Sequence, residues 1–406
     1  MREFYERITV DEALTILLKE AKSFEVGLPF DMCKGMVLSE DIISSVNLPP
    51  FDRSAMDGYA IKAEKSFGAS QANPVCFKIV GESKIGEFPE AKVGEHDLQA
   101  VRIATGAPIP EGCNAVMMVE YTKETGPKTV DFFSSVTPGR NVAPEGEDVR
   151  VGDTVLKKGR VLKPHDIGIL AGIGKSQIKV LKRPDVAIIS TGDELVEVGD
   201  VPPGKIIDVN SYTLSELVHL LGVPHKRKIV RDDPDELKEA IKESLSYDLI
   251  IVSGGTSVGR RDYLPVVVSE MGDLLFHGVS MRPGQPSGFG VIEETPIFML
   301  PGFPVATMVA FEFLVRPFLQ KSAGFAVESS YPGIHAILKR KIASEIGRRD
   351  FVRLELFEEE GVTYADPITS SGSGIISSMV KSDGFLIVSE SMEGIEVGGE
   401  VEVSLF

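Results

Sequence analysis

Residues Leu249 to Gly259 read LIIVSGGTSVG, an apolar run that leads into a loop with three glycines. Glycines in such a loop let backbone amides approach an anion closely. A phosphate cradle is one interpretation and a tight turn between a strand and a helix is the other, and the loop alone favours neither. It is not a Walker A motif, because no Gly-Lys-Ser or Gly-Lys-Thr follows it.

Carboxylates recur at the expected ends of neighbouring strands. Glu194 follows one apolar run, Asp232 and Asp233 follow a second, and Asp262 lies between the glycine loop and a helix. If these strands are neighbours in a sheet, the carboxylates converge on the edge where ligands of open α/β sheets bind. Such oxygen ligands suit Mg²⁺ held between carboxylates and phosphates. For Asp233 a helix cap is the favoured alternative.

Two proline-rich loops lie at other expected strand ends. Residues 281–286 read MRPGQP and residues 300–304 read LPGFP. Arg282 offers a planar set of donors that fits an oxyanion. The prolines fit a structural role in turns, and the shaping of a pocket wall is the alternative. Two further turn-rich segments, 51–60 and 102–110, fit no catalytic triad.

The composition excludes several classes of protein. The 406 residues include 43 Lys and Arg against 60 Asp and Glu, for a formal net charge of −17. This acidic excess argues against a protein that wraps duplex nucleic acid, which needs a basic face. The three cysteines form no CxxC pair and the six histidines form no HExxH motif, so neither disulfides nor a zinc site is expected. Without a signal peptide or a membrane-spanning run, a cytoplasmic protein is expected.

The patterning predicts the elements that position these residues. A helix is predicted over residues 1–22, where Thr9 and Glu12 can form a capping box. Short β-like runs fill much of 47–140, and 330–406 is β-like again. Between them, 185–322 alternates strands with helices, which indicates a parallel sheet with right-handed crossovers. The predicted elements there are strands Asp185–Ser190, Lys228–Val230, Asp248–Val252, Leu274–His277 and Ile297–Leu300, and helices Ser211–Leu221, Pro234–Leu245, Tyr263–Met271 and Val305–Leu319.

Seven motifs then occur in one order along the chain. They are PPFDRSAMDGYAI from Pro49, RIATGAPIPEGCNAV from Arg102, GEDV from Gly146, STGDEL from Ser190, RDDP from Arg231, SGGTSVGRRDY from Ser253 and LPGFPVA from Leu300. Together they resemble the MoeA proteins of molybdenum-cofactor biosynthesis and the E domain of gephyrin. One motif alone would be weak, whereas seven in order are highly specific.

The resemblance implies a multidomain fold of α/β and β parts. A central three-layer α/β molybdopterin-binding domain with a mostly parallel sheet is expected at 184–324, and an inserted β-rich domain at 47–140. An elongated discontinuous domain is expected at 1–46 and 141–183, and a C-terminal β-barrel-like domain at 325–406. The family forms homodimers, with the active site between the α/β domain of one subunit and the inserted domain of the other.

The implied reaction inserts molybdate, or tungstate, into adenylylated molybdopterin with Mg²⁺-dependent release of AMP. The chemistry needs Mg²⁺ to neutralise the diphosphate, and amides and a cation to position phosphate and oxyanion. Molybdopterin adenylyltransferase and other proteins of the cofactor pathway are the expected partners, with no nucleic acid and no membrane.

The motifs also imply the site residues. The acidic and polar catalytic residues are Asp57, Thr105, Glu194, Asp232 and Asp262, of which Glu194 and Asp262 are expected to hold Mg²⁺. The residues expected to bind the substrates are Asp148, Ser253, Gly254, Gly255, Ser257, Gly259, Arg282, Pro301, Pro304, Arg348 and Ser373.

The chain departs from the family's pattern at three positions. Gln285 stands where the second lysine of Lys-Pro-Gly-Lys-Pro is frequent, Gly278 where a further lysine is usual, and Phe303 in place of the Asn of Pro-Gly-Asn-Pro. These positions bear on the choice of oxyanion and on the geometry of its ligands. Two alternatives therefore stay open: a molybdopterin-binding scaffold without insertion activity, and a molybdopterin adenylyltransferase, whose relatives lack the additional domains.

Overall fold

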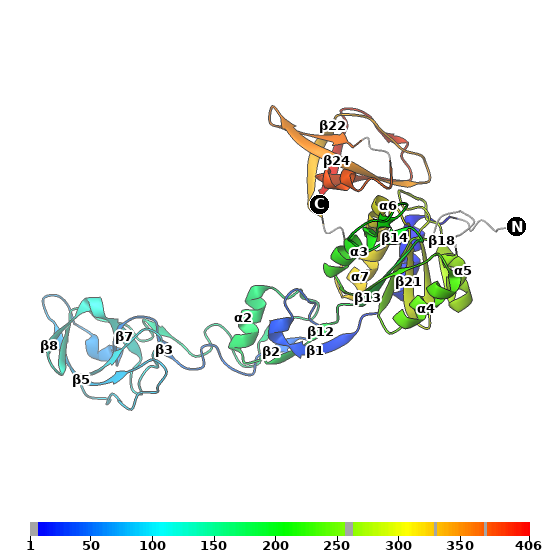
Figure 1. Cartoon of the computed structure of the whole chain (residues 1–406). Coiled ribbons are helices and arrows are strands. Elements are labelled where there is room, and N and C mark those ends of the chain that lie inside the picture. The colour runs from blue at the N-terminus through cyan, green and yellow to red at the C-terminus, as the bar shows by residue number, and fades with distance from the viewer. Residues whose placement is uncertain (1–6, 256–262, 329–330, 369–371) are drawn as a thin grey trace. The chain divides into compact units, whose positions relative to one another are not determined.

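A computed structural model of the chain describes residues 7–255, 263–328, 331–368 and 372–406, with no side-chain description at 226 and 227. The chain folds into two compact units (Figure 1). One unit is Gly27–Lys179, and the other combines Met1–Val26 with Val180–Phe406. No helix in the described part of the chain is both long enough and apolar enough to cross a membrane.

A six-stranded sheet forms the centre of the second unit. Its strands in spatial order are β16 (Val223–Val230), β13 (Asp185–Thr191), β17 (Leu249–Ser253), β21 (Thr295–Leu300), β20 (Gly288–Ile292) and β18 (Asp273–His277). The first four run parallel, and β20 and β18 add antiparallel pairs at one side. Because parallel neighbours end at the same edge, the loops after β16, β13, β17 and β21 meet there.

Helices cover both faces of this sheet, which gives the predicted three layers. Along β17, Leu249 and Ile251 belong to one buried cluster, whereas Ile250 and Val252 belong to another. The first cluster includes residues of α1 (Val10–Glu20), α3 (Asn210–His219), α6 (Pro304–Ala310) and α7 (Arg316–Ser322). The second includes residues of α4 (Pro234–Ser244) and α5 (Leu264–Met271). The strand is buried on both sides, as its continuous apolar sequence requires.

The first helix packs on this sheet. The Thr9 hydroxyl accepts from the Glu12 amide and the Glu12 carboxylate accepts from the Thr9 amide, which completes the predicted capping box. Its apolar face, with Val10, Ala13 and Leu17, is buried in the first cluster. This helix therefore belongs to the same compact unit as the α/β sheet. The predicted domain boundaries, with 1–46 in the elongated domain, stay predictions.

The long helix predicted at Val305–Leu319 is divided in three. A π-helical turn, η4 (Phe311–Val315), separates α6 from α7. Pro317, the second residue of α7, has no amide hydrogen to donate to this turn, which accounts for the change in hydrogen bonding.

The C-terminal part is a closed five-stranded barrel, as the predicted fold class requires. Its strands follow the order β24 (Arg349–Glu359), β25 (Val362–Pro367), β22 (Gly333–Leu338), β28 (Glu400–Leu405) and β26 (Gly384–Val388), and β26 pairs back to β24. A short strand of the α/β part, β19 (Met281–Arg282), extends β24 in parallel. Arg282 is thereby placed in register with Asp350 of the barrel.

The unit Gly27–Lys179 contains an inserted β-rich domain. Its six-stranded sheet has the order β7 (Ala115–Met118), β4 (Gly58–Ile61), β6 (Gln99–Ile103), β5 (Val75–Ser83), β9 (Thr129–Phe132) and β8 (Thr122–Gly126). Segments before and after this sheet pair with each other, β2 (Ile42–Ile43) with β11 (Thr154–Leu156) and β3 (Arg53–Ser54) with β10 (Val142–Ala143). This pairing is the signature of an insertion into a discontinuous domain.

Short elements complete the described chain. They are β1 (Glu25–Pro29), η1 (Phe30–Met32), η2 (Ala63–Ser66), η3 (Val119–Tyr121), α2 (Pro164–Gly172), β12 (Gln177–Leu181), β14 (Leu195–Val196), β15 (Ile206–Ile207), β23 (Ile342–Ala343), α8 (Ser377–Val380) and β27 (Gly394–Ile395).

Candidate functional site

A pocket of about 530 Å³ lies between the carboxyl edge of the α/β sheet and the barrel. The loop after β21 contributes Pro301 and Phe303, and the barrel side contributes Arg348, Arg353 and Ser373. The proline-rich loop 281–286 forms another wall. Four substrate-binding residues predicted from the motifs, Arg282, Pro301, Arg348 and Ser373, therefore line one cavity.

Asp350 organises the arginines of this pocket. Its carboxylate is fully buried and lies 2.5 Å from Nη2 of Arg282 and 2.9 Å from Nε of Arg348. Ser344 donates a third hydrogen bond of 2.9 Å. Charge-assisted bonds of this kind fix the orientation of a guanidinium. Half of the Arg282 side chain stays exposed, so donors remain for a bound anion.

Arg353 adds a third guanidinium to the pocket lining. It donates to the hydroxyl of Ser378, and burial lowers the pKa of Arg353. A cation that has lost part of its hydration is a favourable partner for a desolvated anion. Arg353 was not among the predicted site residues, although its place beside the buried Leu354 on β24 was an available signal.

Ser253 at the end of β17 takes part in a buried polar network. Its hydroxyl donates to the Pro301 carbonyl at 3.2 Å and accepts from Nδ2 of Asn210 at 2.8 Å. Asn210 also donates to the Gly302 carbonyl at 2.8 Å. Among the described residues, the buried Oδ1 of Asn210 has no hydrogen-bond partner. Since buried polar atoms are rarely left unsatisfied, this oxygen is a candidate acceptor for a ligand.

Asn210 was not among the predicted site residues. It is the first residue of α3, where a polar side chain is expected for local reasons alone. Its role depends on the loops after β17 and β21, which come close to Asn210 in the folded chain. The local sequence does not reveal this proximity.

Gly254 is needed for packing. Its φ is +108°, and a Cβ there would lie 2.3 Å from the Thr191 carbonyl oxygen. Its amide donates to the Leu300 carbonyl at 3.0 Å. The tight-turn interpretation thus accounts for Gly254. Gly255, with φ +62°, is the last described residue before 263. The predicted site residues Ser257, Gly259 and Asp262 lie outside the described residues.

Carboxylates gather at the same edge, because the strands that precede them are neighbours. Asp232 accepts from the Thr191 hydroxyl at 2.8 Å, and its amide donates to Oδ1 of Asp193 at 3.3 Å. Glu194 is exposed, and its carboxylate lies beside Gly192. A Cβ added to that glycine would be 3.0 Å from Oε2 of Glu194. Asp233 accepts from two amides at the start of α4, which supports the helix-cap interpretation.

The described carboxylates fit Mg²⁺ only in part. Among the described residues, no group of three His, Cys, Asp or Glu side chains could hold a metal ion. Mg²⁺ frequently uses one or two carboxylates together with substrate phosphates. Glu194, which none of the described side chains pairs with, fits that role as one of two ligands.

Prolines and a barrel loop shape the start of α6. The Pro301 carbonyl accepts from the hydroxyls of Ser253 and Thr307. Pro304 is the first residue of α6, and the Ser373 carbonyl accepts from the next amide at 3.0 Å. Pro301 therefore forms part of the pocket wall, whereas Pro304 has a structural role as a helix start.

Three predicted site residues belong to the unit Gly27–Lys179. Oδ1 of Asp57 accepts from the Thr105 amide at 2.7 Å and from the Thr105 hydroxyl at 3.0 Å. The backbone hydrogen bond, followed by the hydroxyl, holds the pKa of Asp57 below its ordinary value. Asp148 is exposed, and its amide donates to the Leu48 carbonyl at 2.9 Å.

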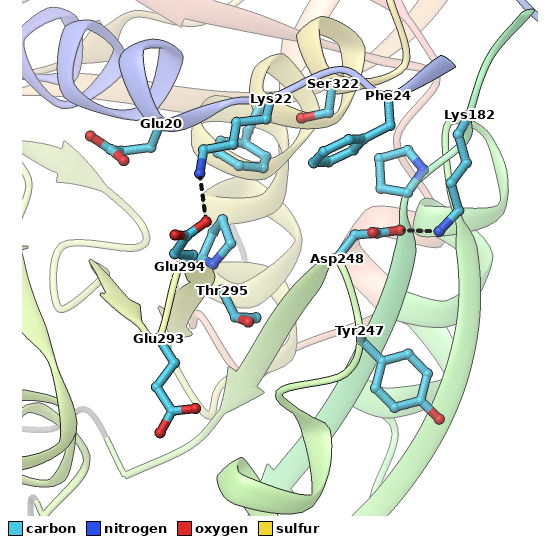
Figure 2. Close-up of a pocket in the computed structure, with 13 residues that line it drawn as sticks. Glu20, Lys22, Phe24, Lys182, Tyr247, Asp248, Glu293, Glu294, Thr295 and Ser322 are labelled. Carbon is cyan, nitrogen blue, oxygen red and sulfur yellow. Dashed lines mark hydrogen bonds and ion pairs between the residues drawn. The ribbon is translucent and has the colours of Figure 1, made fainter. Parts of the chain in front are cut away.

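A second pocket, of about 210 Å³, lies at the opposite edge of the sheet (Figure 2). Its lining includes Asp248, just before β17, and Thr295, the first residue of β21. Lys22 pairs with Glu294 at 3.3 Å, and Lys182 pairs with Asp248 at 2.7 Å. Because ligands of open α/β sheets bind at the carboxyl edge, the larger pocket is the better candidate site.

Comparisons with known proteins cover nearly the whole chain. The MoeA N-terminal region (domains I and II) matches residues 8–174, the “Probable molybdopterin binding domain” matches 187–321, and the MoeA C-terminal region (domain IV) matches 335–406.

Relatives are similar over most of their length. A protein of Methanocaldococcus jannaschii is 42% identical, with 91% of this chain and 89% of that protein covered. The molybdopterin molybdenumtransferase of Haemophilus influenzae is 34% identical, with 98% of each chain covered. The crystal structure of a molybdopterin biosynthesis MoeA protein from Pyrococcus horikoshii has a TM-score of 0.84 and 33% identity, with 98% and 99% covered. This chain therefore belongs to the MoeA family, the family of the molybdopterin molybdenumtransferases.

Proposed function

We propose that the chain inserts molybdate, or tungstate, into adenylylated molybdopterin and releases AMP in an Mg²⁺-dependent reaction. The observation that carries the proposal is the pocket that brings Arg282, Arg348 and Arg353 beside the carboxyl edge of the sheet. A metal oxyanion needs such a set of donors, and the adjoining edge suits a phosphate. Molybdopterin adenylyltransferase is the expected source of the adenylylated substrate.

In this proposal, the pocket holds the oxyanion. Arg282 and Arg348 are fixed by the buried Asp350 and keep donors for an anion. Ser373, which lines the same pocket, offers a hydroxyl. Donors that are oriented before the substrate arrives lose little free energy to reorganisation during the reaction.

The pterin phosphate would bind at the edge of the sheet beside Ser253, Gly254 and Gly255, with the Asn210 amide oxygen as acceptor for a pterin N–H. Glu194 would hold Mg²⁺ together with Asp262. Mg²⁺ supplies neutralisation of the diphosphate charge and polarises a phosphoryl oxygen. Asp232, held by the Thr191 hydroxyl, would orient groups at the same edge.

The proposal includes a homodimer. Asp57, Thr105 and Asp148 belong to the unit Gly27–Lys179, and the remaining site residues belong to the other unit. We propose that a second copy supplies these three residues to each active site, which makes dimerisation a condition for activity.

The scaffold alternative is favoured by the departures at Gln285 and Gly278, where the chain lacks cations that are usual in the family. The two functions are separated by incubating the purified chain with adenylylated molybdopterin, Mg²⁺ and molybdate. Insertion predicts release of AMP and formation of the metal-loaded cofactor. A scaffold would bind the substrate without releasing AMP.

A further inference from the structure

A segment at the start of the chain runs beside the oxyanion pocket. The Ile8 amide donates to the Gly278 carbonyl at 3.2 Å, and the Ser280 amide donates to the Ile8 carbonyl at 2.8 Å. On the other side, the amides of Gly278 and Val279 donate to the carbonyls of Ser287 and Gln285. Three backbone segments thus lie next to one another, and the middle one holds Gly278.

Arg7 reaches the pocket wall from this first segment. With the Gln285 amide oriented so that its oxygen faces Arg7, that oxygen accepts from Nη2 at 2.9 Å and from Nε at 3.2 Å. Gln285 itself lines the pocket. A Cβ placed on Gly278 would lie 3.6 Å from Cγ of Arg7, so the arginine stem passes directly over this glycine.

The geometry explains why Gly278 carries no side chain. Its φ of +103° favours glycine, and the same turn pairs with the segment that carries Arg7. A lysine at this position would be strained.

The ion pairs of the pocket's arginines indicate a role for Arg7. Arg282 and Arg348 face the carboxylates of Asp350 and Glu345, so their formal charges are offset. Among the described residues, no carboxylate forms an ion pair with Arg7. An amide whose oxygen accepts from a guanidinium has only its N–H₂ group left for a ligand, and the neighbouring charge strengthens that donor.

We propose that Arg7, acting through Gln285, supplies positive charge to the oxyanion pocket and makes it selective for a dianion. Arg7 is a positioning residue in this scheme, and Gln285 is the group that contacts the anion. The Arg7–Gln285 pair takes the place of the lysine that is frequent in the family at the position of Gln285. This inference rests on the proposed function, because it assumes that the pocket binds a tetrahedral metal oxyanion.

The test measures binding of molybdate and of perchlorate, a monovalent tetrahedral anion, by calorimetry on the full chain. Arg7→Ala should weaken molybdate binding about fivefold and perchlorate binding about twofold, because the lost interaction scales with ligand charge. Adding Gln285→Lys to Arg7→Ala should restore molybdate affinity. Gln285→Lys alone should not improve it, because the new ammonium would lie against Arg7.

Lys22→Ala is the matched control, since it removes a cation from the same unit that pairs with Glu294 at the opposite edge. It should leave both affinities unchanged. Equal weakening of both anions by Arg7→Ala, without rescue by Gln285→Lys, would show that Arg7 only anchors the first segment and would overturn the inference. So would unchanged molybdate affinity in Arg7→Ala.

Arg348→Ala separates this inference from the proposed function. If Arg348→Ala abolishes molybdate binding while Arg7→Ala does not change it, the pocket assignment stands and the role of Arg7 is wrong. If the unaltered chain binds no molybdate, both are wrong.

Discussion

Asp350 and Arg282 join the barrel to the α/β sheet through an ion pair of 2.5 Å in which the carboxylate is fully buried and the guanidinium is half exposed. The two residues are also in register, as paired residues of β24 and β19. The contact therefore has two consequences. It fixes one wall of the pocket, and it aims the free side of an arginine into the pocket.

Replacing Asp350 by Asn should loosen both arginines that it holds. Removing one partner of a buried ionic cluster is expected to lower the free energy of unfolding by about 3 kcal/mol and the Tm by about 6–12 °C. Molybdate affinity should fall as well. Calorimetric melting and isothermal titration measure the two effects.

Asp366→Asn is the control for this change. Asp366 pairs with Arg340 on the barrel with both side chains partly exposed, so its loss should change the stability by less than about 1 kcal/mol. Equal Tm values for the two variants would contradict the structural role of Asp350.

Gly254→Ala tests the close packing of the strand ends. The new Cβ would lie 2.3 Å from a carbonyl oxygen, at a φ of +108°, and we expect a loss of about 2–4 kcal/mol of stability. At Gly204, φ is +78° but nothing lies within 4 Å of an added Cβ. Gly204→Ala should therefore cost only about 1 kcal/mol. Similar unfolding free energies for both variants would argue against the steric explanation.

Thr105→Val should raise the pKa of Asp57, because it removes the hydroxyl donor and leaves the backbone donor. A lowered folded-state pKa stabilises the protein above the unfolded-state pKa, and this contribution is lost as the pH falls through the folded-state value. In Thr105→Val the contribution should therefore be smaller, and its loss should be complete at a higher pH. Titration of a ¹³C-labelled Asp57 carboxyl measures the change. Thr105→Ser, which keeps the hydroxyl, should titrate like the unaltered chain, and an unshifted Thr105→Val curve would contradict the assignment.

The shared active site of the proposed homodimer can be tested by complementation. Asp57→Ala and Glu194→Ala should each be inactive alone. If the two residues come from different subunits, random reassociation of equal amounts should restore about a quarter of the activity, because half the dimers carry one intact site of two. No recovery in mixed dimers, verified by differential tagging, would place both residues in the same subunit's site.

Local signals were sufficient for many elements of the fold. The predicted helix Pro234–Leu245 corresponds to α4, because Asp233 as a cap and Pro234 as the first residue define its start. By contrast, β20 was not predicted. It contains Gly288 and Gly290, which are poor strand residues, and both are required because an added Cβ would lie 2.9 Å and 2.7 Å from backbone oxygens of β18.

Site residues that belong to motifs could be predicted from the sequence, whereas residues that depend on tertiary contacts could not. Arg282 and Arg348 came from motifs, and the structure brings them to one pocket. Asp350, Asn210 and Arg7 were missed, because each acts through a residue far away in the sequence. Burial and unpaired polar atoms become visible only in the folded chain.

AMP release by the purified chain is the most direct test of the proposed function. With adenylylated molybdopterin, AMP and metal-loaded cofactor should form only when Mg²⁺ and molybdate are both present, and Glu194→Ala and Arg348→Ala should each abolish that formation. Competition with tungstate in the same assay would establish which oxyanion is preferred. Absence of AMP release, or release that persists without Mg²⁺ and in Glu194→Ala, would contradict the proposed reaction and site.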